Sequence, residues 1–243
     1  MNQALFAFLI HNTRFLIPAY PMITFLHNFV PQPLALSIGF LNIHWYGLFA
    51  VAGILAGLAV VWRIGKTRGI TADEIFDLAF YIIIFGILGA RIYSVFLDWP
   101  YYLQNPMQIV AVWNGGLAIH GAIIGGALAL LVYARKNQQS FWRWADLIAV
   151  SLPLGQAIGR FGNYFNQELF GAPTNLPWGI PIEPALRPSQ FSAEQYFHPT
   201  FLYEAILNIV NFLVLLWVFR KWASGQVGKW RGCPGVPHKL FSD

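Results

Sequence analysis

The residues best suited to chemistry lie in one string, residues 159–171, which reads GRFGNYFNQELFG where a hydrophobic segment ends. Arg160 brings a fixed positive charge and a planar fork of N–H donors, a geometry that suits a phosphate group. Asn163 and Asn166 are three residues apart, so they would share a face on a helix. The glycines of the string allow a ligand or another backbone to approach closely. The string is therefore a candidate site for an anionic group, and the alternative is an interfacial loop whose polar groups only cap a helix.

Four residues elsewhere could take part in chemistry, and each also has a structural explanation. His120 is the sole ionisable residue of its apolar segment, where it could handle a proton or pack between glycines. Arg91 could bind an anion or extend towards lipid headgroups. Tyr46 could belong to the aromatic belt at a membrane interface. For Glu204 we expect a charge-balancing role at the positive end of its helix.

The elements that position these residues are predicted to be membrane helices. The chain of 243 residues is 57% hydrophobic and only 10% charged, which is far too apolar for a soluble domain of this length. Its single cysteine excludes an internal disulfide and a cysteine-based metal site. Five apolar segments approach the roughly 20 residues that span a hydrocarbon core. These segments are residues 44–62, 75–97, 115–133, 145–158 and 201–219. The predicted fold is all-α, a polytopic transmembrane helical bundle of about five spans.

The distribution of cations predicts the orientation of the chain in the membrane. Lys and Arg follow the first, third and fifth segments, within residues 63–68, 135–143 and 220–231, whereas residues 98–114 hold none. By the positive-inside rule the N-terminal side lies outside and the C-terminus is cytoplasmic. His120, Arg91 and Arg160 would then all lie towards the outer side, with His120 about five residues inside its span. The cations are dispersed and form no stripe, which argues against nucleic-acid binding.

The string GRFGNYFNQELFG resembles the signature of the bacterial prolipoprotein diacylglyceryl transferases, with Tyr164 where the family usually has phenylalanine. Further matches follow in order along residues 36–222. They are Trp45-Tyr46-Gly47, Gly89-Ala90-Arg91, Asn114-Gly115-Gly116 with His120, and His198-Pro199-Thr200 with Tyr203-Glu204. The resemblance implies a membrane transferase that moves a diacylglyceryl group from phosphatidylglycerol to the lipobox cysteine in the signal peptide of a prolipoprotein. It implies that the protein lies in the plasma (inner) membrane and that a family member has seven spans. It also implies that the reaction needs neither a metal nor an organic cofactor.

The resemblance also implies roles for the candidate residues. Arg160 would hold the lipid phosphate, with Asn163 and Asn166 orienting the headgroup. His120 would accept the thiol proton, since the thiolate is the nucleophile and an unperturbed imidazole titrates at a pH of about 6.5. Four further substrate-binding residues follow from the family motifs. They are Tyr46, Arg91, Glu168 and Gly171.

The two ends depart from the family pattern. Residues 1–43 are predicted to be an N-terminal extension with an outer interfacial segment, and Met22 would be a natural start. Residues 44–222 are predicted to form the transferase domain. Residues 223–243 are a polar tail where the family continues with two more spans, so we expect a truncated or shortened chain that inserts in the membrane and transfers poorly. The alternatives are a non-catalytic membrane relative, or a transporter of small solutes or lipids, for which the sequence lacks the expected internal repeat.

Overall fold

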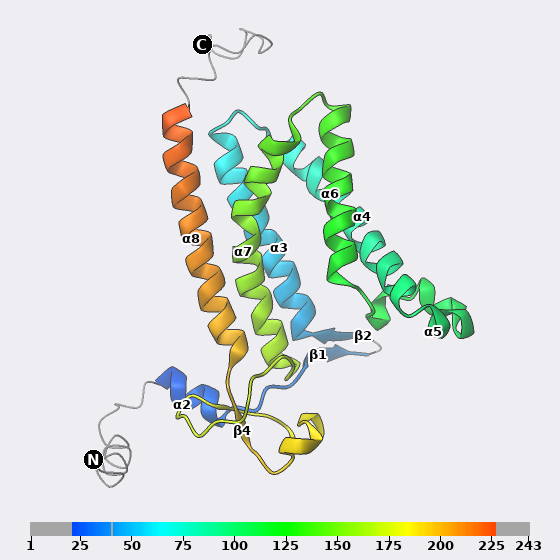
Figure 1. The fold of residues 1–243 in the computed structure, drawn as a ribbon, viewed down its shortest axis with the longest axis vertical. Coiled ribbons are helices and arrows are strands. Elements are labelled where there is room, and N and C mark those ends of the chain that lie inside the picture. Colours follow the sequence, from blue (N-terminus) through cyan, green and yellow to red (C-terminus); the bar gives the residue numbers. More distant parts are fainter. Residues whose placement is uncertain (1–20, 40, 227–243) are drawn as a thin grey trace. The chain divides into compact units, whose positions relative to one another are not determined.

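The computed structural model describes residues 21–39 and 41–226, so the N-terminal stretch before Pro21 and most of the tail lie outside the described residues. The chain divides into two compact units. The first takes its described residues from Met1–Gly53 and Gln156–Ile209, and the second from Ile54–Gly155 and Val210–Asp243. Three long helices contribute to both units. They are α3 (Trp45–Lys66), α7 (Phe141–Phe165) and α8 (Thr200–Gln226) (Figure 1).

Four helices are long and apolar enough to cross a membrane among the residues described. They are α3, α4 (Ala72–Leu97), α6 (Ile119–Lys136) and α8, and they confirm the all-α polytopic class. Four of the five expected spans are among these helices. The fourth expected segment lies inside α7, a 25-residue helix that also carries the polar residues of the string at 159–171 and has Pro153 in its interior. This helix continues into the string as far as Phe165.

The first unit contains two small antiparallel sheets in addition to its helices. One is the hairpin of β1 (Leu34–Ile38) and β2 (Leu41–His44), and the other pairs β3 (Ile180–Pro181) with β4 (Tyr196–Phe197). The helix α2 (Pro21–Asn28) and the short 3₁₀ turns η4 (Pro184–Leu186) and η5 (Ser189–Phe191) complete the unit. Its apolar core gathers around Phe197, with Tyr164, Ile180, Ile182 and Phe201.

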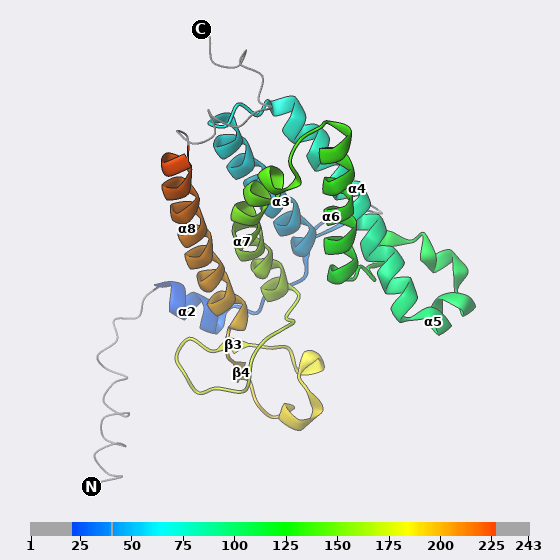
Figure 2. The same cartoon turned by 45° about the horizontal axis from the view of Figure 1, so that its top comes forward.

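The second unit is built around the close pair of α4 and α6, which lie side by side in Figures 1 and 2. Gly89 of α4 faces Gly121 and Gly125 of α6 so tightly that a Cβ atom on any of the three would collide with backbone of the other helix. Small residues at a membrane helix crossing allow this approach. Between the two helices the chain forms α5 (Trp99–Gln104), η2 (Pro106–Ile109) and η3 (Val112–Asn114).

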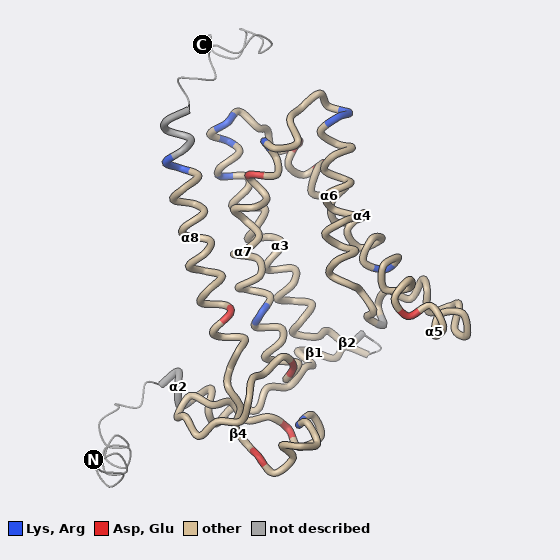
Figure 3. The backbone as a smooth tube through the Cα atoms, viewed as in Figure 1, with Lys and Arg blue, Asp and Glu red and all other residues tan. Residues whose placement is uncertain are grey.

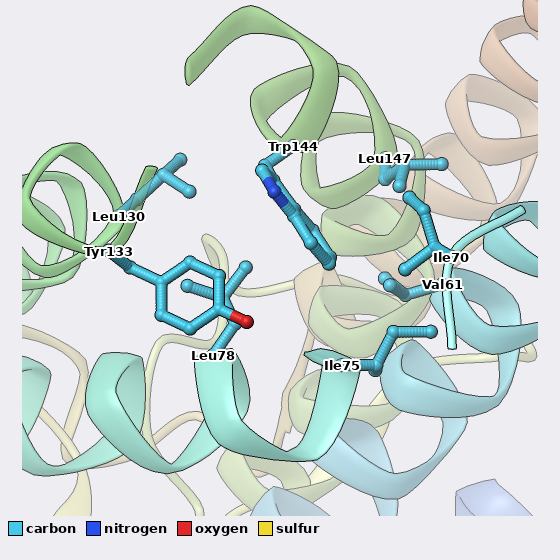
Figure 4. Packing of buried hydrophobic residues seen from close by; sticks show 8 residues of the cluster. All are labelled: Val61, Ile70, Ile75, Leu78, Leu130, Tyr133, Trp144 and Leu147. Atoms are coloured by element: carbon cyan, nitrogen blue, oxygen red, sulfur yellow. The ribbon is translucent and has the colours of Figure 1, made fainter. Parts of the chain in front are cut away.

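The core of the second unit lies where α3, α4, α6 and α7 approach one another. Trp144 and Leu147 of α7 are fully buried among Val61, Ile70, Ile75, Leu78, Leu130 and Tyr133 (Figure 4). The indole of Trp144 donates to Gln139, whose amide donates in turn to Glu74. Glu74 and Thr71 form a capping box that fixes the start of α4.

Candidate functional site

The string at residues 159–171 ends its helix with a turn that folds the chain back on itself. The N–H of Glu168 donates to the carbonyl of Asn163 at 3.1 Å, and the N–H of Gln167 donates to that of Tyr164 at 3.0 Å. This pair of bonds is the Schellman motif, with Gln167 in the left-handed conformation at φ +53°. The turn therefore returns the carboxylate of Glu168 to the side chains of the last helical turn.

A polar network links both ends of this turn to α8. The Arg160 guanidinium is 2.5 Å from the Glu204 carboxylate and donates to the Asn163 amide oxygen at 3.4 Å. The Asn163 amide donates to Glu168 at 2.8 Å, and Asn166 donates to the same carboxylate oxygen at 3.4 Å. The Arg160 and Glu204 side chains keep 32% and 42% of their surface exposed. The structure thus joins four of the predicted residues and adds Glu204 as the partner of Arg160.

Gly171 lies where the loop after the network meets the start of α8. Its N–H donates to the His198 carbonyl at 3.0 Å. A Cβ atom at this position would come within 2.9 Å of the His198 Cβ and 3.0 Å of the Thr200 methyl carbon. Gly171 therefore permits a close contact between two segments, and the Thr200 hydroxyl reinforces that contact by donating to the Leu169 carbonyl.

Tyr46 lies beside the string, on the first turn of α3. A Cβ atom on Gly162 would come within 2.8 Å of the Tyr46 ring, so this glycine lets the tyrosine pack directly on α7. The neighbouring Trp45 stacks on Phe165 with ring centroids 4.8 Å apart. Tyr46 itself stays exposed over 46% of its surface. Its ring is thereby held next to the string, while nearly half of the residue surface stays exposed.

Two features of this region had not been predicted from sequence. The Gln167 side chain is buried, donates to the Pro31 carbonyl at 2.8 Å and accepts from the Glu183 N–H at 2.7 Å. The signal that could have found it is a glutamine at the position after a helix where glycine is usual.

The second feature is a chain of three rings. The Tyr203 hydroxyl accepts from the Trp178 indole at 2.8 Å and lies 3.1 Å from the His198 ring nitrogen Nδ1. With its lone pairs facing the indole, this hydroxyl can donate its proton to His198.

Arg91 belongs to the second unit, where backbone carbonyls surround it. Its side chain is 6% exposed, and each of its three nitrogens donates a hydrogen bond. The acceptors are the Tyr102 hydroxyl and the carbonyls of Gln108, Ile109, Ala111, Gly115 and Gly116. Among the described residues Arg91 makes no ion pair, because the only pair found there joins Arg160 to Glu204.

His120 is the second residue of α6, and its side chain is exposed. The predicted span began at residue 115, but Gly115 and Gly116 have φ angles of +85° and +67° and cannot belong to a right-handed helix. The helix therefore starts later, and His120 lies in its first turn instead of about five residues inside. Its ring stacks on Tyr93 of α4 with centroids 5.8 Å apart.

No group of three or more His, Cys, Asp or Glu residues that could hold a metal ion occurs in residues 21–39 and 41–226.

The predicted site residues fall into two sets, one in each compact unit. Tyr46, Arg160, Asn163, Asn166, Glu168 and Gly171 belong to the first unit, and Arg91 and His120 to the second.

The sequence is similar to a large set of curated proteins. Residues 33–231 match the family described as prolipoprotein diacylglyceryl transferase. A phosphatidylglycerol–prolipoprotein diacylglyceryl transferase of Trichormus variabilis is 46% identical over 81% of this chain and 70% of its own length. Proteins of the same name from Synechococcus elongatus and Synechocystis are 46% and 45% identical, over 79% and 78% of this chain and 66% and 67% of their own lengths. A family match over most of the chain, together with identities this high, means that the chain belongs to the prolipoprotein diacylglyceryl transferase family.

Proposed function

We propose that this protein transfers the diacylglyceryl group of phosphatidylglycerol to the lipobox cysteine of a prolipoprotein. In this reaction the cysteine sulfur forms a bond to the glyceryl carbon, the bond from that carbon to the phosphate oxygen breaks, and glycerol phosphate leaves with the electron pair. The thiol must lose its proton, and the leaving phosphate needs positive charge and N–H donors. The observation that carries the proposal is the network around Arg160.

Arg160 is the proposed ligand of the lipid phosphate. Its guanidinium offers a planar fork of donors, and about a third of the side chain is exposed. The ion pair with Glu204 is half-exposed, and such pairs contribute only about 0–1 kcal/mol. A phosphate can therefore replace the Glu204 carboxylate at the guanidinium with little loss. The Asn163 amide would then remain beside the site and orient both the guanidinium and the bound phosphate.

Glu168, Asn166, Gly171 and Tyr46 are proposed to shape the surroundings of this phosphate. One carboxylate oxygen of Glu168 accepts hydrogen bonds from the side-chain amides of both Asn163 and Asn166. Gly171 keeps the following loop against α8, and Tyr46 presents an exposed phenol beside Gly162.

His120 is the proposed acceptor of the thiol proton, a role that rests on the surroundings of the second unit alone. It is exposed at the first turn of α6, and an imidazole can accept a proton near neutral pH. His198 is the weaker candidate, because its Nδ1 faces the Tyr203 hydroxyl that Trp178 polarises.

The chain is a multi-pass membrane protein, and we propose that its C-terminal side faces the cytoplasm in the plasma (inner) membrane. Within the second unit, basic residues gather at the turn after α3, at the turn after α6 and near the end of α8, whereas the opposite end of the α4–α6 pair holds few (Figure 3). The positive-inside rule assigns this end to the cytoplasm. Reporter fusions after Lys136 should be active only inside the cell, and an external signal would reverse the assignment.

The experiment that tests the function measures the lipidation of a lipobox peptide by the full chain in liposomes. Vesicles that contain phosphatidylglycerol should give a peptide whose mass increases by one diacylglyceryl group, with release of glycerol phosphate. Vesicles of phosphatidylcholine alone and a peptide with serine in place of the cysteine should give neither product. Absence of product in the phosphatidylglycerol vesicles, from a chain that is folded and inserted, would refute the proposal.

A further inference from the structure

We infer that Arg91 is a positioning residue that sets the start of α6 and thereby holds His120, and that it does not bind the lipid phosphate. This inference rests on the proposed role of His120 in the transfer reaction. It concerns only contacts within the second unit, where Arg91, the segment between α4 and α6, and His120 all lie.

The donors of Arg91 are already used by the chain itself. Nε donates to the Ile109 carbonyl at 2.9 Å, and Nη2 donates to the carbonyls of Gln108 and Ala111. Nη1 donates to the carbonyls of Gly115 and Gly116, both at 2.7 Å. A guanidinium has five N–H groups, and these acceptors occupy all three of its nitrogens. A phosphate could reach it only by breaking bonds that hold the segment in place.

Two of those acceptors determine how α6 begins. Gly115 and Gly116 have positive φ angles that only glycine adopts easily, and their carbonyls both turn towards Arg91. Two residues later the N–H of Ala118 donates to the Ala90 carbonyl at 3.1 Å. Ala118 is the residue before the first turn of α6, so Arg91 and its neighbour Ala90 fix the direction in which the helix starts.

The position of the His120 ring depends directly on how this helix starts. Its ring stacks on Tyr93, which is two residues after Arg91 on the same helix, and the next residue, Gly121, packs against Gly89. The rotation of the first turn decides where the imidazole points. Loss of the Arg91 bonds would free Gly115 and Gly116, and the first turn would then be held only by the Ala118–Ala90 hydrogen bond, the Gly121–Gly89 contact and the Tyr93 stacking.

The glycines provide a matched pair of variants for the test. A Cβ atom on Gly116 would lie 2.6 Å from Arg91 Nη1 and 2.8 Å from the Tyr102 hydroxyl, so G116A must displace the guanidinium. A Cβ atom on Gly115 meets nothing within 4 Å, so G115A strains the backbone without a clash at Arg91 and acts only on the single bond from the guanidinium to the Gly115 carbonyl. R91K keeps the charge and loses the fork of donors.

The first measurement separates catalysis from lipid binding, using the full chain in phosphatidylglycerol vesicles. R91K and G116A should each lower kcat by at least about tenfold and leave KM for phosphatidylglycerol within about twofold. The double variant should be no worse than the more severe single one, because both changes break the same contact. G115A should lose clearly less activity than G116A. A rise in KM with kcat retained would make Arg91 a phosphate ligand, and equal losses in G115A and G116A would attribute the effect to strain; either result overturns the inference.

The second measurement does not need an active enzyme. Diethyl pyrocarbonate acylates exposed imidazoles, and mass spectrometry of the digested protein reports each histidine separately. R91K and G116A should change the labelling rate of His120 by at least about threefold, since a released first turn moves its ring. His198, in the other unit, provides the internal control and should keep its rate. Unchanged labelling of His120 in both variants overturns the inference. If instead H120Q retains full transfer activity, the proposed proton acceptor is wrong while the labelling still decides whether Arg91 positions His120.

Discussion

Arg160 and Arg91 both lie on long helices of this protein, but their guanidinium groups donate to different kinds of acceptor. Arg160 faces a carboxylate and an amide oxygen at a helix end, and about a third of its side chain is exposed. Arg91 is 6% exposed and faces five backbone carbonyls and one phenol. A carboxylate on a side chain can leave when a competing anion arrives. Carbonyls that belong to a folded segment cannot leave without unfolding that segment.

The residue type alone does not identify a ligand-binding arginine. The acceptors around the guanidinium decide whether its donors are available. An arginine paired with one half-exposed carboxylate is ready to exchange partners, because such a pair contributes only about 0–1 kcal/mol. An arginine held by buried carbonyls stabilises the fold, since hydrogen bonds to a charged group contribute about 1.5–3 kcal/mol each.

The largest expected effect comes from replacing Arg160. R160K keeps the positive charge and loses the planar fork, so we expect the transfer rate in phosphatidylglycerol vesicles to fall by about a hundredfold to a thousandfold. R187K is the matched control, because Arg187 lies in the same unit and, within the part of the chain that the structure describes, donates to the carbonyls of Ile182 and Ser192 and not to the network. An R160K enzyme with a near-normal rate would count against a bidentate phosphate clamp.

The next largest effect concerns the turn that returns Glu168 to the network. Q167A removes both hydrogen bonds of a buried amide, which should lower the free energy of unfolding by about 1–3 kcal/mol. Q167G removes the same bonds but relieves the left-handed backbone at φ +53°, so it should be more stable than Q167A by about 1–2 kcal/mol. Thermal unfolding in detergent measures both differences. A Q167A protein as stable as the parent would mean that the amide bridges contribute nothing, because alanine and glutamine share the same left-handed strain at this position.

The apolar helices could be predicted from the sequence because the bilayer imposes a length and a composition on them. Four of the five expected spans are confirmed by α3, α4, α6 and α8. The start of α6 was predicted four residues too early. The pattern of apolar residues continues through Gly115 and Gly116, and hydropathy carries no information on the φ angles that stop the helix there.

The polar string was recognised as a candidate site from its residue types, but its partners were not. The contact between Arg160 and Glu204 joins two helices, and sequence spacing predicts only neighbours on one helix. The Gln167 bridge to Pro31 is likewise a contact between distant segments. That Arg91 binds substrate stays a prediction from sequence, and the donors that motivated it are occupied by carbonyls.

A smaller effect should follow from releasing Arg160 from its ion pair. E204Q removes the charge that competes with a phosphate, so we expect KM for phosphatidylglycerol to fall by up to about fivefold, the value of a half-exposed ion pair. E194Q, which changes a carboxylate of the same unit outside the network, should leave KM unchanged. A higher KM in E204Q would show that Glu204 holds Arg160 in position for the lipid and would reverse the proposed exchange.

The smallest effect is expected for Asn166, the outermost member of the network. Its amide reaches Glu168 at 3.4 Å, whereas the Asn163 amide reaches the same carboxylate oxygen at 2.8 Å and its own oxygen accepts from Arg160. Because a hydrogen bond weakens with length, N166A should change the transfer rate by no more than about threefold, a loss of under about 1 kcal/mol. N163A should lose far more, since it leaves both Arg160 and Glu168 without their shared partner. Parallel rate measurements on the two variants distinguish a network residue from a substrate ligand. A loss beyond about tenfold in N166A would mean that Asn166 contacts the lipid headgroup directly, because its bond to Glu168 is too weak to account for a loss of that size.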